Sequence, residues 1–175
     1  QLDYWLLSTL NVLVRDVTQA YETYDVLGAT RPIETFVNQL SNWYLRRSRR
    51  RYWKSESDGD KAAAYETLYI ALRTLSKLLA PAMPFMAEEL YQNLVRSEDE
   101  TAPLSVHLAE WPKPNSEYIN EKLNREMALV MRLASLGHAA RMKANLKVRQ
   151  PLAEVAFAVS SAEDAEIVGR FKELL

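Results

Sequence analysis

Arginine and aromatic residues are interleaved in one short segment of the sequence, from Asn42 to Lys54. The guanidinium group of arginine pairs with phosphate through two parallel hydrogen bonds, and it also stacks on flat rings. A neighbouring tryptophan offers a surface on which an unpaired base can stack. These residue types therefore favour contact with RNA. The alternative interpretation is a solvated basic helix end whose charges complement the helix dipole.

Helical phase separates this segment into two faces. An apolar stripe that starts at Ile33 passes, at about 100° per residue, through Arg47 and Arg51. These two arginines are expected to extend along the edge of the core and to pair with acids or backbone carbonyls. The opposite face carries Arg46, Arg49 and Trp53. We expect those three to be more exposed than Leu40, Tyr44 and Arg47.

Six residues of the segment are candidates for contact with RNA. They are Asn42, Trp43, Arg46, Arg49, Arg50 and Trp53. Taken alone, Trp43 is better explained as a core anchor beside Phe36 and Leu40.

A second basic segment runs from Gly137 to Pro151. Its candidates for contact with the nucleic-acid backbone are Lys143, Lys147 and Arg149, which fall outside the apolar stripe of the preceding helix. The alternative is a helix C-terminus that is rich in cations because the dipole favours them there. His138, without a second histidine or an acid beside it, is interpreted as a polar surface or packed residue.

The charges of the chain are segregated. Residues 35–55 hold six basic residues and residues 127–153 hold five, with no acid in either range. The other eleven basic residues share the rest of the chain with all 23 acids. Although the net charge is only −1, two positive stretches in an acidic protein favour a polyanionic partner.

The sequence shows no arrangement for catalysis. Its four glycines are isolated, so no phosphate-binding loop is expected, and Glu88 and Glu89 diverge by about 100° on a helix. The chain has no cysteine and only two histidines, so we expect neither a disulfide framework nor a metal site. No segment approaches the roughly 18 apolar residues of a membrane span. Because it begins at Gln1 without a signal peptide, we expect a cytoplasmic fragment.

Apolar residues at steps of three and four predict a mainly α-helical bundle. The first helix covers residues 3–25 and ends at Gly28; the second is capped by Thr30 and continues into the arginines. Further helices are expected after the acidic loop 55–60 as far as Pro81, over 84–95, and from a cap at Ser116 to Lys143. Residues 97–115 are expected to be irregular, with a brief strand at 105–108.

The period changes after Pro151. Apolar Val155, Phe157 and Val159 alternate with other residues, which predicts a strand over 152–160, followed by a helix over 162–175. Residues 3–145 are expected to lack a sheet. We therefore predict two domains, a helical bundle at 1–150 and the start of a truncated α/β element at 151–175.

Several segments resemble the anticodon-binding domain of class I aminoacyl-tRNA synthetases, in particular that of isoleucyl-tRNA synthetase. The segments span nearly the whole chain, and they begin with Leu2 to Asn11. The most specific is Phe36 to Tyr44 with the following arginines, and Leu79 to Tyr91 is similar to a proline-broken helix pair of these enzymes. Ser105 to His107 with Trp111–Pro112, and then Lys147 to Leu152, complete the order. The arginine-rich form resembles the branch found in eukaryotic cytosol, archaea and some bacteria.

This resemblance implies a tRNA-binding module of a larger isoleucine–tRNA ligase. The expected partners are tRNA(Ile) and the catalytic domain of the parent chain, and no membrane. The parent would use ATP and Mg²⁺, whereas this fragment would hold no cofactor. The resemblance also implies that the two basic segments lie on one surface against the anticodon stem. Two alternatives are the same domain of a valyl or leucyl enzyme, and a helical protein-interaction scaffold with a basic surface.

Overall fold

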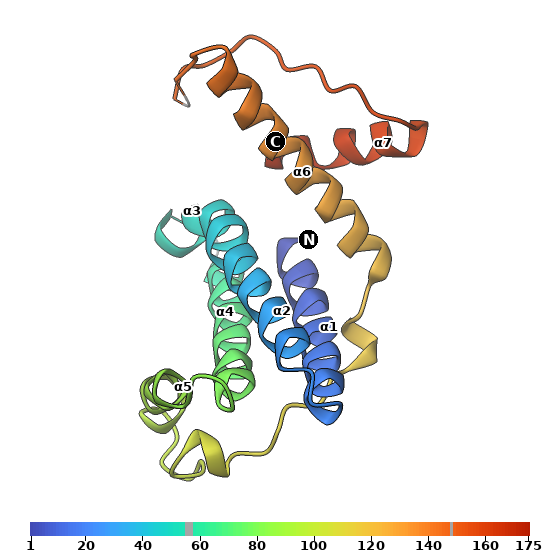
Figure 1. The fold of residues 1–175 in the computed structure, drawn as a ribbon. Coiled ribbons are helices and arrows are strands. Elements are labelled where there is room, and N and C mark those ends of the chain that lie inside the picture. The colour runs from blue at the N-terminus through green and yellow to red at the C-terminus, as the bar shows by residue number, and fades with distance from the viewer. Residues whose placement is uncertain (55–57, 148) are drawn as a thin grey trace. The chain divides into compact units, whose positions relative to one another are not determined.

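The computed structural model describes residues 1–54, 58–147 and 149–175, and every regular element among them is helical (Figure 1). The α-helices are α1 (Leu2–Glu22), α2 (Val26–Gln39), α3 (Arg46–Lys54), α4 (Asp58–Leu79), α5 (Pro84–Tyr91), α6 (Glu121–Lys143) and α7 (Ala162–Arg170). Two π-helical turns continue α2 and α5, η1 (Leu40–Leu45) and η2 (Gln92–Arg96). Short 3₁₀ turns cover η3 (Val106–Leu108), η4 (Ser116–Tyr118) and η5 (Lys172–Leu174).

The chain divides into two compact units, Gln1–Asn120 and Glu121–Leu175. In the first unit α1 packs against α2 and α4, and α5 packs against α4. The stripe predicted for the first helix consists of Leu6, Leu10, Leu13, Val17, Ala20 and Tyr24; it is buried as far as Ala20, together with Trp5 and Val14. Tyr24 lies beyond the end of α1 and is 92% exposed. Steps of three and four place the buried residues on one face, so the packing follows from the sequence pattern. The predicted boundary near residue 150 stays a prediction.

The turn between α1 and α2 differs from the prediction. Tyr24, not Gly28, takes the left-handed conformation that ends α1, with φ 58°. Asp25 caps α2, because its carboxylate accepts a hydrogen bond of 2.8 Å from the backbone nitrogen of Gly28. Gly28 therefore lies inside α2, where a Cβ would come within 2.2 Å of the Asp25 carboxylate. Thr30 is also internal, and its hydroxyl donates to the carbonyl of Val26.

Replacing Asp25 with Ala is expected to lower the free energy of unfolding by about 1 kcal/mol, the usual contribution of an N-cap side chain. Urea denaturation of the chain measures it. Thr30→Ala is the matched control, since Thr30 would be the cap if α2 began where the sequence places it. A larger loss in Thr30→Ala than in Asp25→Ala would contradict the observed cap.

A smaller cluster surrounds α5 at one end of this unit. Tyr91, Val95 and Val106 are buried there together with Ala80 and Ala87. Glu88 accepts hydrogen bonds from the Ser105 hydroxyl at 2.7 Å and from the Val106 nitrogen at 3.1 Å, so its role is to fasten the loop. The brief strand predicted at 105–108 is wrong. Ser105 caps a 3₁₀ turn that places Val106 in the cluster.

The irregular connection to α6 is attached to polar side chains of α1. The Trp111 indole donates to the Thr18 hydroxyl at 2.8 Å. Further along, the Asn115 nitrogen donates to Asn11 Oδ1 and the Asn120 nitrogen to the Ser8 hydroxyl, both at 2.8 Å. Ser8 is buried without any exposed surface, and this bond satisfies its hydroxyl. The predicted Ser116 cap is separated from α6, which begins only at Glu121.

The second unit consists of α6 and α7. α6 buries Met127, Val130 and Leu133, and α7 and the residue after it bury Ile167 and Phe171. Arg170 forms an ion pair with the buried carboxylate of Glu126. The strand predicted over 152–160 is wrong, because a strand needs a neighbouring strand for its backbone groups and none occurs among the described residues. The segment is extended but unpaired, and Val155 is 63% exposed.

None of the described helices is long and apolar enough to cross a membrane.

Candidate nucleic-acid interface

The first basic segment lies at the end of one long helical rod formed by α2, η1 and α3. After Phe36 this rod buries Leu40, Trp43, Tyr44 and Ser48, and three of these positions, Leu40, Tyr44 and Ser48, recur at steps of four residues. That spacing is longer than the 3.6 residues of an α-helical turn, and the wider π turn η1 accommodates it. Val37, which the straight-helix stripe was expected to bury, is 39% exposed.

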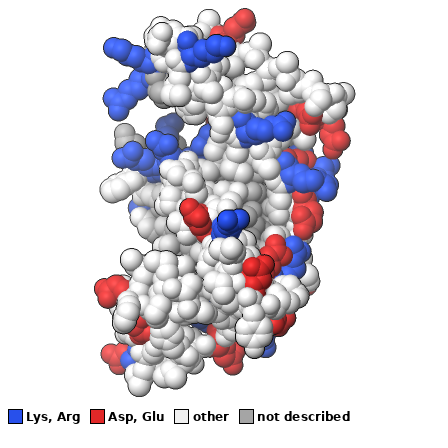
Figure 2. All heavy atoms as spheres, viewed as in Figure 1, with Lys and Arg blue, Asp and Glu red and all other residues white. Residues whose placement is uncertain are grey.

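The predicted exposure of α3 is confirmed. Arg46, Arg49 and Arg50 are exposed, and Trp53 exposes 79% of its surface. On the other face, Leu40 and Tyr44 are buried and Arg47 is half-buried. Asn42 is exposed one turn earlier, and its amide nitrogen donates to Asn38 Oδ1 at 2.7 Å. Blue side chains gather over this end of the first unit in Figure 2.

Trp43 lies in the core and exposes 7% of its surface. The guanidinium carbon of Arg47 lies 3.2 Å from the centroid of its ring, a cation–π contact. Burial, and then the charge of Arg46, lower the pKa of Arg47. Within the candidate site Trp43 therefore supports an arginine, as the interpretation of a core anchor predicts for this residue.

Arg51 is fixed between two carboxylates. Its Nη1 and Nη2 donate to the two oxygens of Asp3 at 2.7 and 2.8 Å, and its Nε donates to Asp60 at 2.9 and 3.0 Å. Tyr44 joins the network through a hydroxyl that donates to Asp3 at 2.6 Å. The prediction that Arg51 pairs with acids is confirmed. Bidentate hydrogen bonding of this kind fixes the orientation of a guanidinium group as well as its position.

Electrostatics in this network favour the charged forms of Asp3 and Arg51 and the neutral form of Tyr44. Burial alone would raise the pKa of the Asp3 carboxyl, but the hydrogen bonds from Arg51 and Tyr44 hold it below its ordinary value. The Asp3 hydrogen bonds raise the pKa of Arg51, and burial followed by the Asp3 contact raises that of Tyr44. Asp3 is therefore ionised and Tyr44 is protonated at neutral pH.

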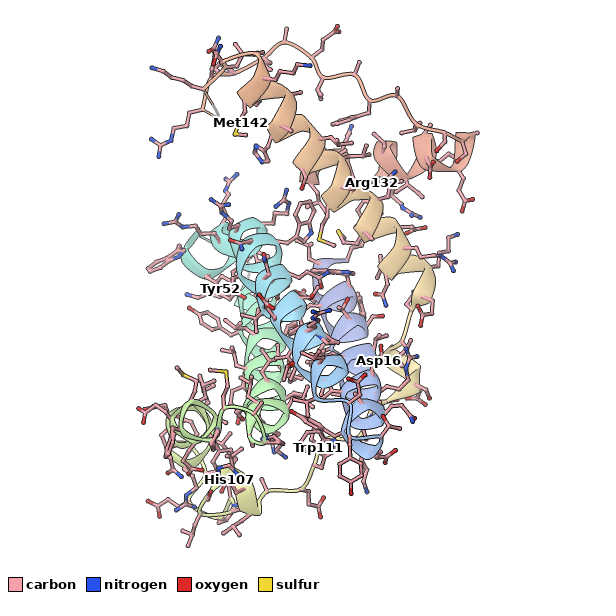
Figure 3. All side chains as sticks on the ribbon, viewed as in Figure 1. Asp16, Tyr52, His107, Trp111, Arg132 and Met142 are labelled. Atoms are coloured by element: carbon pink, nitrogen blue, oxygen red, sulfur yellow. The ribbon has the colours of Figure 1, made fainter. Side chains whose placement is uncertain are left out.

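Tyr52, a residue of α3, contacts α4. Its hydroxyl donates to the carbonyl of Ala64 at 3.3 Å, and its ring meets that of Tyr65 edge to face, with centroids 5.0 Å apart. Figure 3 shows Tyr52 at one end of the first unit and His107 at the other. His107 and His138 are both exposed. Among the residues that the structure describes, no group of histidine and acidic side chains could hold a metal ion.

The second basic segment surrounds the end of α6 in the second unit. Lys143, Lys147 and Arg149 are exposed there. Arg141 closes the turn, since its Nη1 donates to the carbonyls of Lys147 and Gln150 at 3.0 and 2.9 Å. Asn145 takes a left-handed conformation in the same turn, with φ 53°. That this segment shares one surface with α3 stays a prediction.

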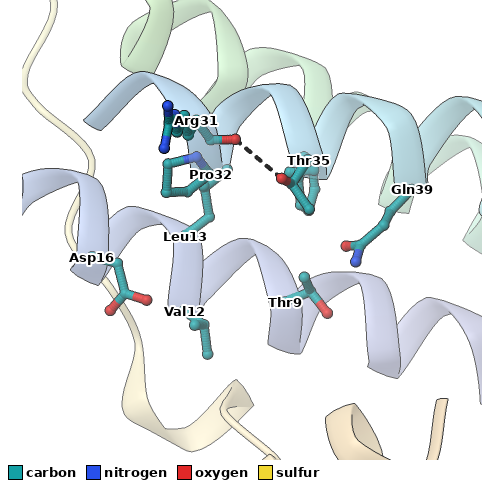
Figure 4. Close-up of a pocket in the computed structure, with 9 residues that line it drawn as sticks. Thr9, Val12, Leu13, Asp16, Arg31, Pro32, Thr35 and Gln39 are labelled. Atoms are coloured by element: carbon teal, nitrogen blue, oxygen red, sulfur yellow. Dashed lines mark hydrogen bonds between the residues drawn. The ribbon is translucent and has the colours of Figure 1, made fainter. Parts of the chain in front are cut away.

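A groove of about 390 Å³ lies between α1 and α2 (Figure 4). Leu13, Pro32 and Phe36 contribute its apolar surface, and Thr35 and Asp16 are among its polar groups. Thr35 already donates to the carbonyl of Arg31, and Asp16 accepts from Arg15 at 2.8 Å. No sequence pattern predicts the groove, because two separate helices form it. Its described lining residues contain no nucleophile with an adjacent base.

In the part of the chain that the structure describes, fold and site together define a helical module with two exposed basic segments at the ends of helices. A family model described as the anticodon-binding domain of tRNA ligase matches residues 3–157. The chain belongs to this family of anticodon-binding domains.

The similar proteins are isoleucine–tRNA ligases of bacteria. The chain is 55% identical over 173 residues to the ligase of Dehalococcoides mccartyi strain 195, covering 99% of this chain and 17% of the ligase. It is 45% identical over 172 residues to that of Treponema denticola, covering 98% of this chain and 15% of the ligase. The ligase of Clostridium novyi is 44% identical over 163 residues, which are 93% of this chain and 16% of the ligase.

Two facts follow from these matches. The chain spans about a sixth of the length of the relatives it matches. The expected resemblance to a eukaryotic and archaeal branch is not borne out, since these relatives are bacterial.

Proposed function

We propose that this chain binds the anticodon arm of tRNA(Ile) within an isoleucine–tRNA ligase, with α3 as its main contact surface. The observation that carries the proposal is the exposure of Arg46, Arg49 and Arg50 on a helix whose other face is fixed by Arg51. Cations held at fixed spacing suit a partner with regularly spaced phosphates. The family and the names of the similar ligases support tRNA over an acidic protein.

In this proposal phosphate contacts set the register and base contacts supply discrimination. The three arginines pair with the backbone, and the exposed ring of Trp53 offers a stacking surface for a base. Lys143, Lys147 and Arg149 add further phosphate contacts. The catalytic domain of the parent chain would carry out the reaction with ATP and Mg²⁺ in the cytoplasm. This module contributes binding energy remote from the reacting groups.

Replacing Arg46 and Arg49 with Ala in the full-length ligase is expected to weaken binding of tRNA(Ile) about thirtyfold. Each lost phosphate contact contributes on the order of 1 kcal/mol, and about 1.4 kcal/mol corresponds to a tenfold change in affinity. The slope of log affinity against log salt should flatten by about 1 to 2. Filter binding across a salt series measures both quantities, and ATP–pyrophosphate exchange without tRNA should be spared.

The matched control is Arg73→Ala with Lys113→Ala, which removes the same charge from two exposed positions outside α3. It should leave the affinity within about twofold of wild type, because only long-range, screened attraction is lost. Equal effects of the two double variants would sink the assignment of α3 to tRNA. The scaffold alternative would be favoured if both double variants bound tRNA as wild type does, while Arg46→Ala with Arg49→Ala no longer captured an acidic protein.

A further inference from the structure

α3 has little apolar surface with which to hold itself in place. Arg46, Arg49, Arg50 and Trp53 are exposed, and among residues 46–53 the one buried residue is the small Ser48, while Tyr52 is half-buried against α4. Arginines three and four positions apart on one helix also repel each other. The orientation of α3 must therefore be maintained by contacts from outside the helix.

The strongest of these contacts reaches α3 from the first turn of α1. Asp3 lies 48 residues from Arg51 in the sequence, yet both of its carboxylate oxygens accept hydrogen bonds from the Arg51 guanidinium group. The Arg51 and Asp3 side chains are only 20% and 23% exposed, so water screens this pair less than a surface pair. Asp60, at 48% exposed, holds the same guanidinium group from the start of α4.

The same carboxylate also holds the turn that precedes α3. Tyr44 lies in η1, and its buried hydroxyl donates to Asp3 at 2.6 Å. Asp3 thus contacts the rod on both sides of the junction between η1 and α3. One acidic side chain therefore links the π turn and the basic helix to the first turn of α1.

We propose that Asp3 is a positioning residue for tRNA binding, which holds α3 through Arg51 and Tyr44 so that Arg46 and Arg49 face the RNA. The inference rests on the proposed function. The expected change in tRNA affinity on removing the Asp3 charge has an unusual sign, because a carboxylate near a phosphate-binding surface repels RNA through space. Removing that charge should tighten binding if Asp3 acts only through its field. If Asp3 positions α3, removal should weaken binding.

The test compares Asp3→Asn with wild type in the full-length ligase, using a labelled transcript of tRNA(Ile) in filter binding across a salt series. We expect Asp3→Asn to raise Kd three- to tenfold, because only a fraction of molecules then holds α3 in the competent orientation. The competent form makes the same phosphate contacts, so the salt slope should stay at the wild-type value. By contrast, the variant that combines Arg46→Ala with Arg49→Ala is expected to show a flatter dependence of log affinity on log salt. Asp3→Glu, which keeps the carboxylate, should recover part of the affinity.

Asp16→Asn is the matched control, since it removes the same charge from an exposed position on α1. Its affinity should equal that of wild type or exceed it slightly. Binding by Asp3→Asn that is as tight as wild type, or tighter, would overturn the inference. If Asp3→Asn is unfolded by circular dichroism, Tyr44→Phe takes its place, with an expected two- to threefold rise in Kd and the same contrary outcome.

Binding of tRNA by α3 and positioning of α3 by Asp3 are tested by different variants. If Arg46→Ala with Arg49→Ala leaves binding unchanged, α3 does not bind tRNA and the positioning role of Asp3 falls with it. If that variant weakens binding while Asp3→Asn does not, α3 binds tRNA without help from Asp3.

Discussion

Reversing the charge at both Arg46 and Arg49, by replacement with Glu, is expected to lower the affinity of the ligase for tRNA(Ile) by about a thousandfold at low salt. The two positions are exposed on one helix, so the change leaves the core intact. Each reversal removes a phosphate contact of roughly 1 kcal/mol and adds a repulsion of similar size, giving about 4 kcal/mol in total. The difference in affinity between this variant and wild type should narrow as salt is raised, because screening weakens both the lost attraction and the added repulsion.

Filter binding or fluorescence anisotropy with labelled tRNA measures this change. Arg73→Glu with Lys113→Glu changes the net charge equally, and it should reduce affinity only by the screened long-range term. A comparable loss in both variants would show that tRNA senses the total charge of the domain and not α3.

Truncation of Trp5 to Ala is expected to cost about 3 to 5 kcal/mol of unfolding free energy. The side chain is 1% exposed on the buried stripe of α1, and its removal leaves a large cavity in the first unit. Since a domain of this kind is stable by roughly 5 to 15 kcal/mol, much of its stability would be lost. Thermal and urea denaturation followed by circular dichroism measure the effect.

The neighbouring residue supplies the control for this prediction. Tyr4 is 70% exposed, so Tyr4→Ala should change the unfolding free energy by no more than about 0.5 kcal/mol. Similar losses at the two positions would mean that α1 is not packed as described.

The long helices were predictable because their apolar residues repeat with the helical period. α1 buries its predicted stripe from Leu6 to Ala20, whereas Tyr24, the last predicted member, lies beyond the helix end and is exposed. The start of α2 was not predictable in this way. Glycine is the usual residue for a left-handed helix end, but here Tyr24 adopts that conformation and leaves Gly28 to fit beside the Asp25 carboxylate.

The exposed residues of the candidate site were predictable from phase alone, since Arg46 and Arg49 lie opposite the buried positions. The partners of Arg51 were not, because Asp3 is distant in sequence and only the packing of α1 brings it near. The strand at 152–160 was predicted from alternation, a pattern that describes which side chains could face a core. A strand also needs a neighbour, and alternation carries no information about that.

The attachment of the irregular connection to α1 has a consequence for hydrogen exchange. Asn115 and Asn120 lie outside any helix of four or more residues, yet their amide hydrogens are donated to side chains of Asn11 and Ser8. An amide exchanges with solvent only when its hydrogen bond opens, so these two must wait until the connection lifts from α1. The segment that looks least ordered by secondary structure therefore exchanges these two amide hydrogens no faster than it detaches from the first helix.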